Sequence, residues 1–201
     1  LTLNLPIDIS LIDGRVSYQL LGQFTDSSNW LNNSANLSLS IQALTGEIED
    51  TWIQSLNWQQ RLVLGDGDLK STHDDNTVKD NLTIAKIEIA PPLTNLSAQT
   101  TLDLENEQLN INLNKVNAEL LGGSVFIANA QVPFLDSRSV DVKLTRVDLE
   151  ELLALDPKQG IIVTGKISGN LPVSTNGKKF TISDGELHNV TNGIIKVANN
   201  P

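Results

Sequence analysis

Apolar and polar residues alternate with a period of two along most of the chain. Aliphatic side chains occupy every second position from Leu1 to Ile9, again within 37–43 and 109–113, and within 96–104 at every alternate position but Thr100. Successive side chains of a β-strand point to opposite faces of the sheet, so each run predicts a strand with one aliphatic face. Similar runs continue to residue 197 and predict about a dozen short strands, the pattern of an all-β protein.

Turn signals separate these runs. We expect turns at Asp13-Gly14 and Asp184-Gly185, and a tight turn or a bulge at Gly122-Gly123. The polar, acidic stretch 65–80 predicts a loop or a hairpin tip. No strong linker divides the chain, so residues 1–201 are expected to form a single β-rich domain.

Two segments depart from the alternation. Residues 148–155 predict a short helix, because Asp148 can cap it, Glu151 follows three residues later as in a capping box, and Pro157 lies beyond its end. Residues 48–64 have mixed parity and are compatible with a helix or with a wound pair of strands.

Composition removes several classes of function. The chain has 24 acidic and 14 basic residues and a net charge of −10, which argues against a nucleic-acid binder. It has no cysteine, so disulfide scaffolds, thiolate zinc sites and cysteine nucleophiles are excluded. It has no apolar run long enough to span a membrane. It begins at Leu1 inside an alternating run and without a signal peptide, so we expect a fragment of a longer chain.

The candidate chemical sites are weak. His73 lies beside two aspartates, and Asp66-Gly67-Asp68 resembles the start of a calcium loop, but the further ligands of such sites are missing. A solvated acidic loop is the simpler interpretation of both. Gly122-Gly123-Ser124 lacks the G-x-S-x-G spacing of a nucleophile elbow. We therefore expect no catalytic residue, no bound metal and no cofactor.

The aliphatic faces themselves are the remaining signal. The tryptophans Trp30, Trp52 and Trp58 are expected to pack in a core rather than to contact a lipid interface. Aromatic residues make up only 4% of the chain, so the predicted strands present mainly leucine, isoleucine and valine. Such faces can close into a sandwich core or form an open slot for acyl chains. Periodicity leaves both alternatives open.

The second half of the chain carries an ordered set of motifs. In chain order they are Asn117–Val125, Pro133-Phe134, Val140–Leu144, Val147–Leu153, Thr164–Pro172 and Ile182–Leu187. Together they resemble the C-terminal region of AsmA-like proteins, most closely the YdbH type, whose C-terminal domain has carried the label "dicarboxylate transport". The resemblance is strongest over residues 115–197.

This resemblance implies a function and a location. Proteins of this kind are anchored in the inner membrane of Gram-negative bacteria and cross the periplasm as a long curled β-sheet with a hydrophobic concave face. They are thought to conduct phospholipids to the outer membrane. A small outer-membrane lipoprotein is an implied partner, which would extend the sheet by adding strands. The resemblance brings no catalytic residues with it.

From parity and resemblance together we predict an all-β fold with one or two short helices, built as an elongated, curled, antiparallel-rich sheet that forms a hydrophobic groove. The groove would shield phospholipid acyl chains. The residues predicted to line it are Leu102, Leu104, Leu109, Ile111, Leu113, Val125, Ile127, Val140, Val142, Leu144, Ile161, Val163 and Ile167.

Two alternative functions remain. A periplasmic module that binds small dicarboxylates would need converging cations. The arginines Arg15, Arg61, Arg138 and Arg146 are scattered in the sequence, which does not support it. A structural β-sandwich or solenoid would also account for the strands, although a solenoid requires a fixed repeat, and the spacing here is irregular.

Overall fold

The computed structural model confirms an all-β protein dominated by one large antiparallel sheet. The structure describes residues 9–23, 33–48, 50–65, 68–72, 80–105, 108–132, 139–156, 161–175 and 180–197. The expected strand at residues 1–8 and the positions of Trp30, His73, Asp66-Gly67, Pro133-Phe134 and Pro157 lie outside the described residues.

The described part of the chain contains fourteen strands and one helix. The strands are β1 (Ile9–Gln23), β2 (Ser34–Ile48), β3 (Thr51–Gly65), β4 (Asp68–Ser71), β5 (Leu82–Glu88), β6 (Leu93–Glu105), β7 (Gln108–Leu120), β8 (Gly123–Val132), β9 (Ser139–Asp148), β10 (Ile161–Thr164), β11 (Lys166–Thr175), β12 (Phe180–Ile182), β13 (Glu186–Asn189) and β14 (Ile194–Val197). The helix is α1 (Leu149–Ala154), inside the segment predicted to be helical.

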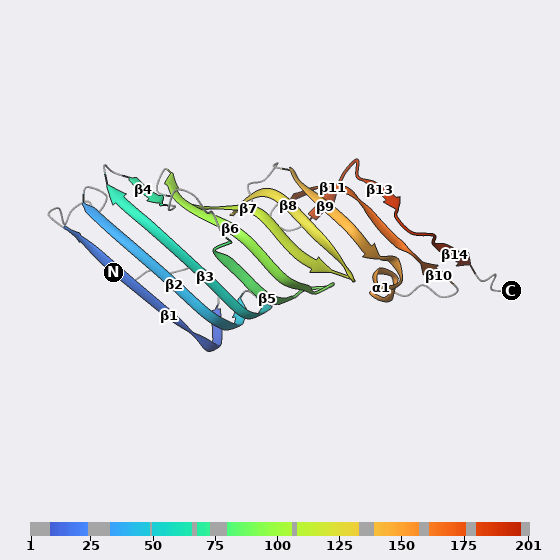
Figure 1. Cartoon of the computed structure of the whole chain (residues 1–201), viewed down its shortest axis with the longest axis horizontal. Helices are drawn as coiled ribbons and strands as arrows, with labels where there is room; N and C mark the ends of the chain where they lie inside the picture. The colour runs from blue at the N-terminus through green and yellow to red at the C-terminus, as the bar shows by residue number, and fades with distance from the viewer. Residues whose placement is uncertain are drawn as a thin grey trace.

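The strands follow one another across the sheet almost in chain order. The main path is β1-β2-β3-β4-β6-β7-β8-β9-β11-β12, with β5 between β3 and β6, and β13 beside β11. All pairs are antiparallel. The result is an elongated single layer with β1 at one end, while β10 and β14 pair separately near the other end (Figure 1).

The strands are longer than their alternation suggests. β1, β2 and β3 each have 15 residues, and β6 and β7 each have 13. The turn expected at Asp13-Gly14 is wrong, because β1 runs through this dipeptide, where Gly14 has φ of +131° and the register with β2 shifts. Residues 51–64 of the segment with mixed parity lie in one strand, β3, and Ile48 ends β2. The Leu121-Gly122 turn between β7 and β8 confirms the turn expected there.

Bulged residues explain the broken parity. One residue in each of five strands has a positive φ, and we call this set the crease: Ala43, Ser55, Asn95, Lys115 and Arg146. At each of these positions the strand gains a residue that is out of step with the alternation. In β9, for example, both Leu144 and Val147 are buried, although they are three residues apart.

The crease repeats one local arrangement. Each left-handed residue is followed by an aliphatic residue and then by Asn, Ser, Thr or Asp, as in Ser55-Leu56-Asn57 and Lys115-Val116-Asn117. In β3 and β7 the third side chain hydrogen-bonds the carbonyl of the left-handed residue: Asn57 Nδ2 donates to Ser55 O at 3.1 Å, and Asn117 Nδ2 donates to Lys115 O at 2.8 Å. Bulges bend strands and increase their twist, so this line curls the sheet.

A second irregularity is a gap within the sheet. β4 pairs with the end of β3 and β5 with its beginning, so the two short strands share one strand position between β3 and β6. The side chain of Asn81 bridges the gap. Its Nδ2 lies 2.9 Å from Gln59 O and 3.1 Å from Thr100 O, and its Oδ1 accepts from Thr100 N at 2.6 Å.

Further buried polar side chains complete this bridge. Gln60 and Thr100 are only 4% and 1% exposed. The Gln60 amide donates to Ser71 Oγ, which also accepts from Leu102 N at 2.6 Å, and Trp58 Nε1 donates to Thr100 Oγ1 at 2.7 Å. Buried polar groups are costly only when they lack hydrogen-bond partners. These side chains are paired with one another and with the backbone, so they link β3 to β6 at the place where neither β4 nor β5 lies between them.

Helix α1 is held by its cap. Asp148 Oδ1 accepts from Glu150 N at 2.9 Å and from Glu151 N at 3.5 Å, which confirms the predicted N-cap. The reciprocal half of the expected capping box is not formed, because the Asp148 N–H donates to Leu121 O at 2.9 Å instead. The cap therefore ties the helix to the β7–β8 turn.

The crease can be tested with a β-branched residue. We expect Lys115→Val to lower the free energy of unfolding by about 1–2 kcal/mol, because valine adopts a left-handed backbone poorly. The matched control is Lys143→Val, at an exposed and extended position of β9, where valine is expected to be neutral or slightly stabilising. Denaturant unfolding of both variants measures the difference, and equal values would contradict the role of the crease.

The bridge at the gap makes a separate prediction. Asn81→Ala leaves the carbonyl of Gln59 and both backbone groups of Thr100 without this partner, so we expect a loss of about 2–4 kcal/mol in unfolding free energy. Asn36→Ala, on an exposed position of β2, should change it by less than about 0.5 kcal/mol. A loss at Asn81 no greater than at Asn36 would show that the amide does not close the sheet.

Candidate functional site

The main sheet presents one aliphatic face that continues from strand to strand. Directly opposite residues of antiparallel strands lie on the same face. Leu102 is opposite Ile111, and Ile127 is opposite Val142, which in turn is opposite Leu171. Because each of these strands is held in register with the next, the aliphatic positions of β6, β7, β8, β9 and β11 form continuous rows across the sheet.

Most of the predicted lining residues lie on this face. The register places these nine together: Leu102, Ile111, Leu113, Val125, Ile127, Val140, Val142, Leu144 and Ile167. The backbones of Leu104 and Leu109 pair with each other, but their side chains lie outside the described part of the structure. That any of them contacts lipid stays a prediction.

Ile161 and Val163 are not joined to these rows. They belong to β10, which pairs with β14 in a separate two-stranded sheet, and Gly165, with φ of +113°, separates them from β11. The shared parity of 161–171 therefore does not correspond to one strand, because a single left-handed residue lets the chain leave one sheet and enter the other.

The first half of the chain contributes to the same face. Leu37 and Leu39 of β2 stand opposite Leu62 and Gln60 of β3, and Ile84 stands opposite Leu96. Their alternation is visible in the sequence, but the predicted lining begins only at Leu102, so they were missing from it. The parity of Leu37 and Leu39 was the signal that could have found them.

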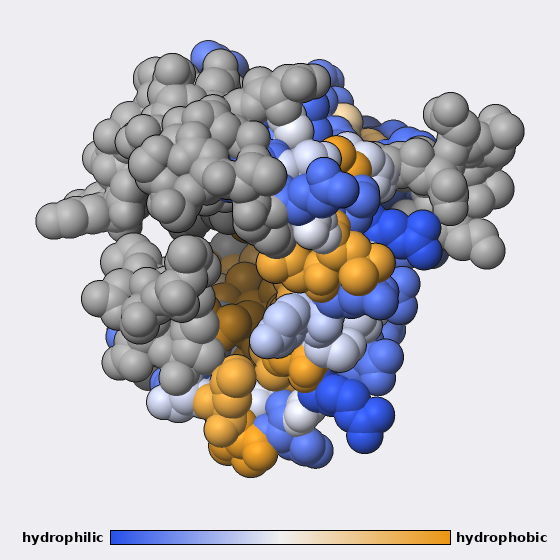
Figure 2. Space-filling view, turned by 90° about the vertical axis from the view of Figure 1, so that its left-hand side faces the viewer, coloured by the Kyte–Doolittle hydropathy of each residue, from blue (hydrophilic) through white to orange (hydrophobic). Residues whose placement is uncertain are grey.

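The face is folded into a hollow. Viewed from the β1 end, hydrophobic residues gather around a central depression, and hydrophilic residues lie on the outside (Figure 2). Middle residues are buried, such as Leu62 at 7% and Leu102 at 5% exposure. On β1, the residues that continue the aliphatic rows are exposed to solvent: Val16 is 54% and Tyr18 76% exposed.

The opposite face of the sheet is polar. Asn112 and Asn114 of β7 alternate with the aliphatic residues, and Asp141 and Lys143 do so in β9. Asn112 Nδ2 donates to Asp103 Oδ2 at 3.3 Å across this outer face. The sheet therefore separates an apolar side from a polar side along its length.

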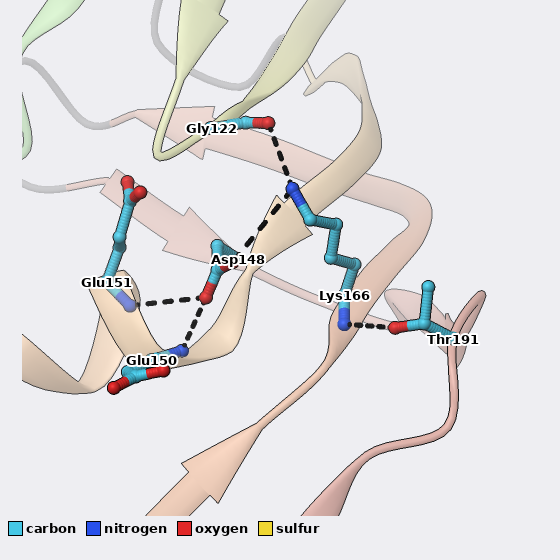
Figure 3. A network of polar contacts seen from close by, with 6 residues as sticks. All are labelled: Gly122, Asp148, Glu150, Glu151, Lys166 and Thr191. Carbon is cyan, nitrogen blue, oxygen red and sulfur yellow. Dashed lines mark hydrogen bonds and ion pairs between the residues drawn. The ribbon is translucent and has the colours of Figure 1, made fainter.

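A cavity of about 610 Å³ lies at the edge of the sheet beside the β7–β8 turn. It is lined by the adjacent ends of β6 to β9 and by Glu151 of α1. Lys166 supports the turn: its Nζ donates to Gly122 O at 3.4 Å and lies 3.9 Å from Asp148 Oδ2, and its backbone N–H donates to Thr191 Oγ1 at 2.9 Å (Figure 3).

The described residues hold no group of three or more side chains suited to a metal ion. None of the helices in this part of the chain has the length and apolar character needed to cross a membrane. The arginines Arg15, Arg61 and Arg146 stand on β1, β3 and β9, on separate strands of the sheet, and Arg138 lies outside the described residues.

Comparison with known proteins gives one match. A family model described as "YdbH-like: Intermembrane phospholipid transport protein YdbH" matches residues 1–201. Neither the curated proteins nor the solved structures contain a significant match to the chain. The match extends the resemblance of residues 115–197 to the rest of the chain, and the chain belongs to the YdbH-like family of intermembrane phospholipid transport proteins.

Proposed function

We propose that the aliphatic face holds the acyl chains of phospholipids while they pass between membranes. The observation that carries this is the pairing of aliphatic residue with aliphatic residue from strand to strand, such as Ile127 opposite Val142 and Val142 opposite Leu171. Each methylene removed from water contributes about 0.8 kcal/mol, so a sixteen-carbon chain in water costs on the order of 12 kcal/mol. A continuous apolar face removes that cost at every step along the sheet.

The chain acts as a conduit rather than as an enzyme. Movement of a lipid along an apolar face makes and breaks no covalent bond, so it requires no nucleophile, acid or base. The polar outer face supports this function, because alternating residues such as Asn112 and Lys143 keep the reverse side of the sheet compatible with water.

The location follows from the same function. The protein works in the periplasm of a Gram-negative bacterium, anchored in the inner membrane by parts outside residues 1–201. A small outer-membrane lipoprotein adds strands to a free sheet edge, since unpaired edges are templates for strand addition. Among the described strands, β12 and β13 each pair only with β11, so each offers a second edge.

Photo-crosslinking tests the aliphatic face directly. We expect photo-reactive residues at Ile111 and Val142 to form phospholipid adducts in cells, because both positions lie on the aliphatic face. The matched controls are the next residues, Asn112 and Lys143, whose side chains point to the opposite face. Mass spectrometry of the adducts measures the outcome.

Adducts with protein only at Ile111 and Val142 would overturn the proposal, as would equal lipid labelling at the inner and outer positions. Adjacent residues of one strand lie at the same place in the cell. A difference in lipid labelling between them therefore shows which face of the sheet contacts lipid and does not depend on where the protein is located.

A further inference from the structure

The cavity beside the β7–β8 turn lies where the polar and the aliphatic face of the sheet meet at its edge. Thr94, Glu119, Ser124 and Thr145 form one row of paired residues on the polar face and line the cavity from that side. Leu120 and Leu121 line the cavity and also pack against the buried cluster of Leu144, Val147 and Ile167. Its volume of about 610 Å³ falls within the roughly 300–1,000 Å³ of small-molecule sites. An amphiphile whose acyl chains lie on the aliphatic face near Leu144 would therefore place its polar end in the cavity by passing Leu120 and Leu121 at the edge of the sheet.

The crease brings an arginine to this cavity. Thr145 and Arg146 are consecutive in β9, yet both line it, whereas consecutive residues of a regular strand point to opposite faces. Arg146 has φ of +56°, and its N–H donates to Ser168 Oγ at 2.9 Å. A non-glycine residue in this strained conformation beside a cavity is a feature that functional sites often show.

The two cationic side chains near the cavity differ in whether they already form hydrogen bonds or ion pairs. Lys166 is held by Gly122 and Asp148. By contrast, within the described residues, the Arg146 guanidinium makes no hydrogen bond or ion pair. The lining also contains two carboxylates, Glu119, which accepts from Thr94 Oγ1 at 3.2 Å, and Glu151, close to Gly122.

One available cation beside two carboxylates matches a ligand that carries both charges. We propose that this cavity binds the headgroup of a zwitterionic phospholipid, with Arg146 pairing with the phosphodiester and Glu119 and Glu151 pairing with the ammonium. Guanidinium–phosphate hydrogen bonds are charge-assisted and geometrically specific, which suits Arg146 to this role. The proposal rests on the proposed function, because the acyl chains of the same lipid occupy the aliphatic face.

The test uses purified full-length protein incubated with vesicles of equal parts phosphatidylethanolamine and phosphatidylglycerol. Both lipids carry the phosphodiester, but only the first carries an ammonium. After re-isolation of the protein, mass spectrometry counts each bound lipid. We expect the wild-type protein to be enriched in phosphatidylethanolamine.

Two variants separate the two charges. Arg146→Gln is expected to lower the bound amount of both lipids by about threefold to tenfold, because the shared phosphodiester loses its partner. Glu119→Gln combined with Glu151→Gln is expected to remove the preference for phosphatidylethanolamine and to leave bound phosphatidylglycerol unchanged.

Matched controls are Lys143→Gln, an exposed cation of the same strand, and Glu150→Gln, in the same first turn of α1 as Glu151. Neither residue lines the cavity. Circular dichroism checks that all variants fold. Wild-type binding without enrichment, or variants that behave as their controls, would overturn the headgroup site alone, whereas a wild-type protein that takes up neither lipid would overturn the proposed function as well.

Discussion

The register of the antiparallel ladder is the constraint on which this structure depends. A slip of one residue moves every side chain of a strand to the other face. Here an aliphatic face must continue through strands joined mainly by backbone hydrogen bonds, as where Leu102 is opposite Ile111 and Val125 is opposite Leu144. The same constraint explains why the two bulges between β2 and β3 compensate each other: the register shifts on one side of Leu44 and shifts back on the other.

The bulges, in turn, decide the shape of the sheet. An extended layer without a second sheet cannot bury its aliphatic side by packing against a partner layer, so burial depends on curvature. Ala98 and Thr100 are nearly inaccessible although they lie in a single layer, whereas Val16 and Tyr18 at the β1 end are open. Apolar surface in the middle of the sheet is thus protected by its neighbours, and at this end it is left exposed.

The sequence predicts the all-β class, helix α1 and most of the aliphatic face, because side-chain alternation and helix capping are local signals. It does not predict that Leu113 and Val116 belong to one strand, since the left-handed Lys115 between them reverses the parity. The bridge by Asn81 was also inaccessible to sequence reasoning, because it depends on which strands become neighbours. Arg146 and Glu119 belong to one cavity for the same reason: they are distant in sequence and meet only through strand pairing.

Because the strands follow one another nearly in chain order, the length of the sheet increases with the number of strands. Each added strand lengthens the layer by about 4.8 Å, so the ten strands of the main path extend over roughly 43 Å. Contacts form mostly between successive strands, and one more hairpin therefore adds length without any change to the cross-section. In such a protein the length of the sheet is set by the number of strands, while its curvature is set separately by where each strand is creased.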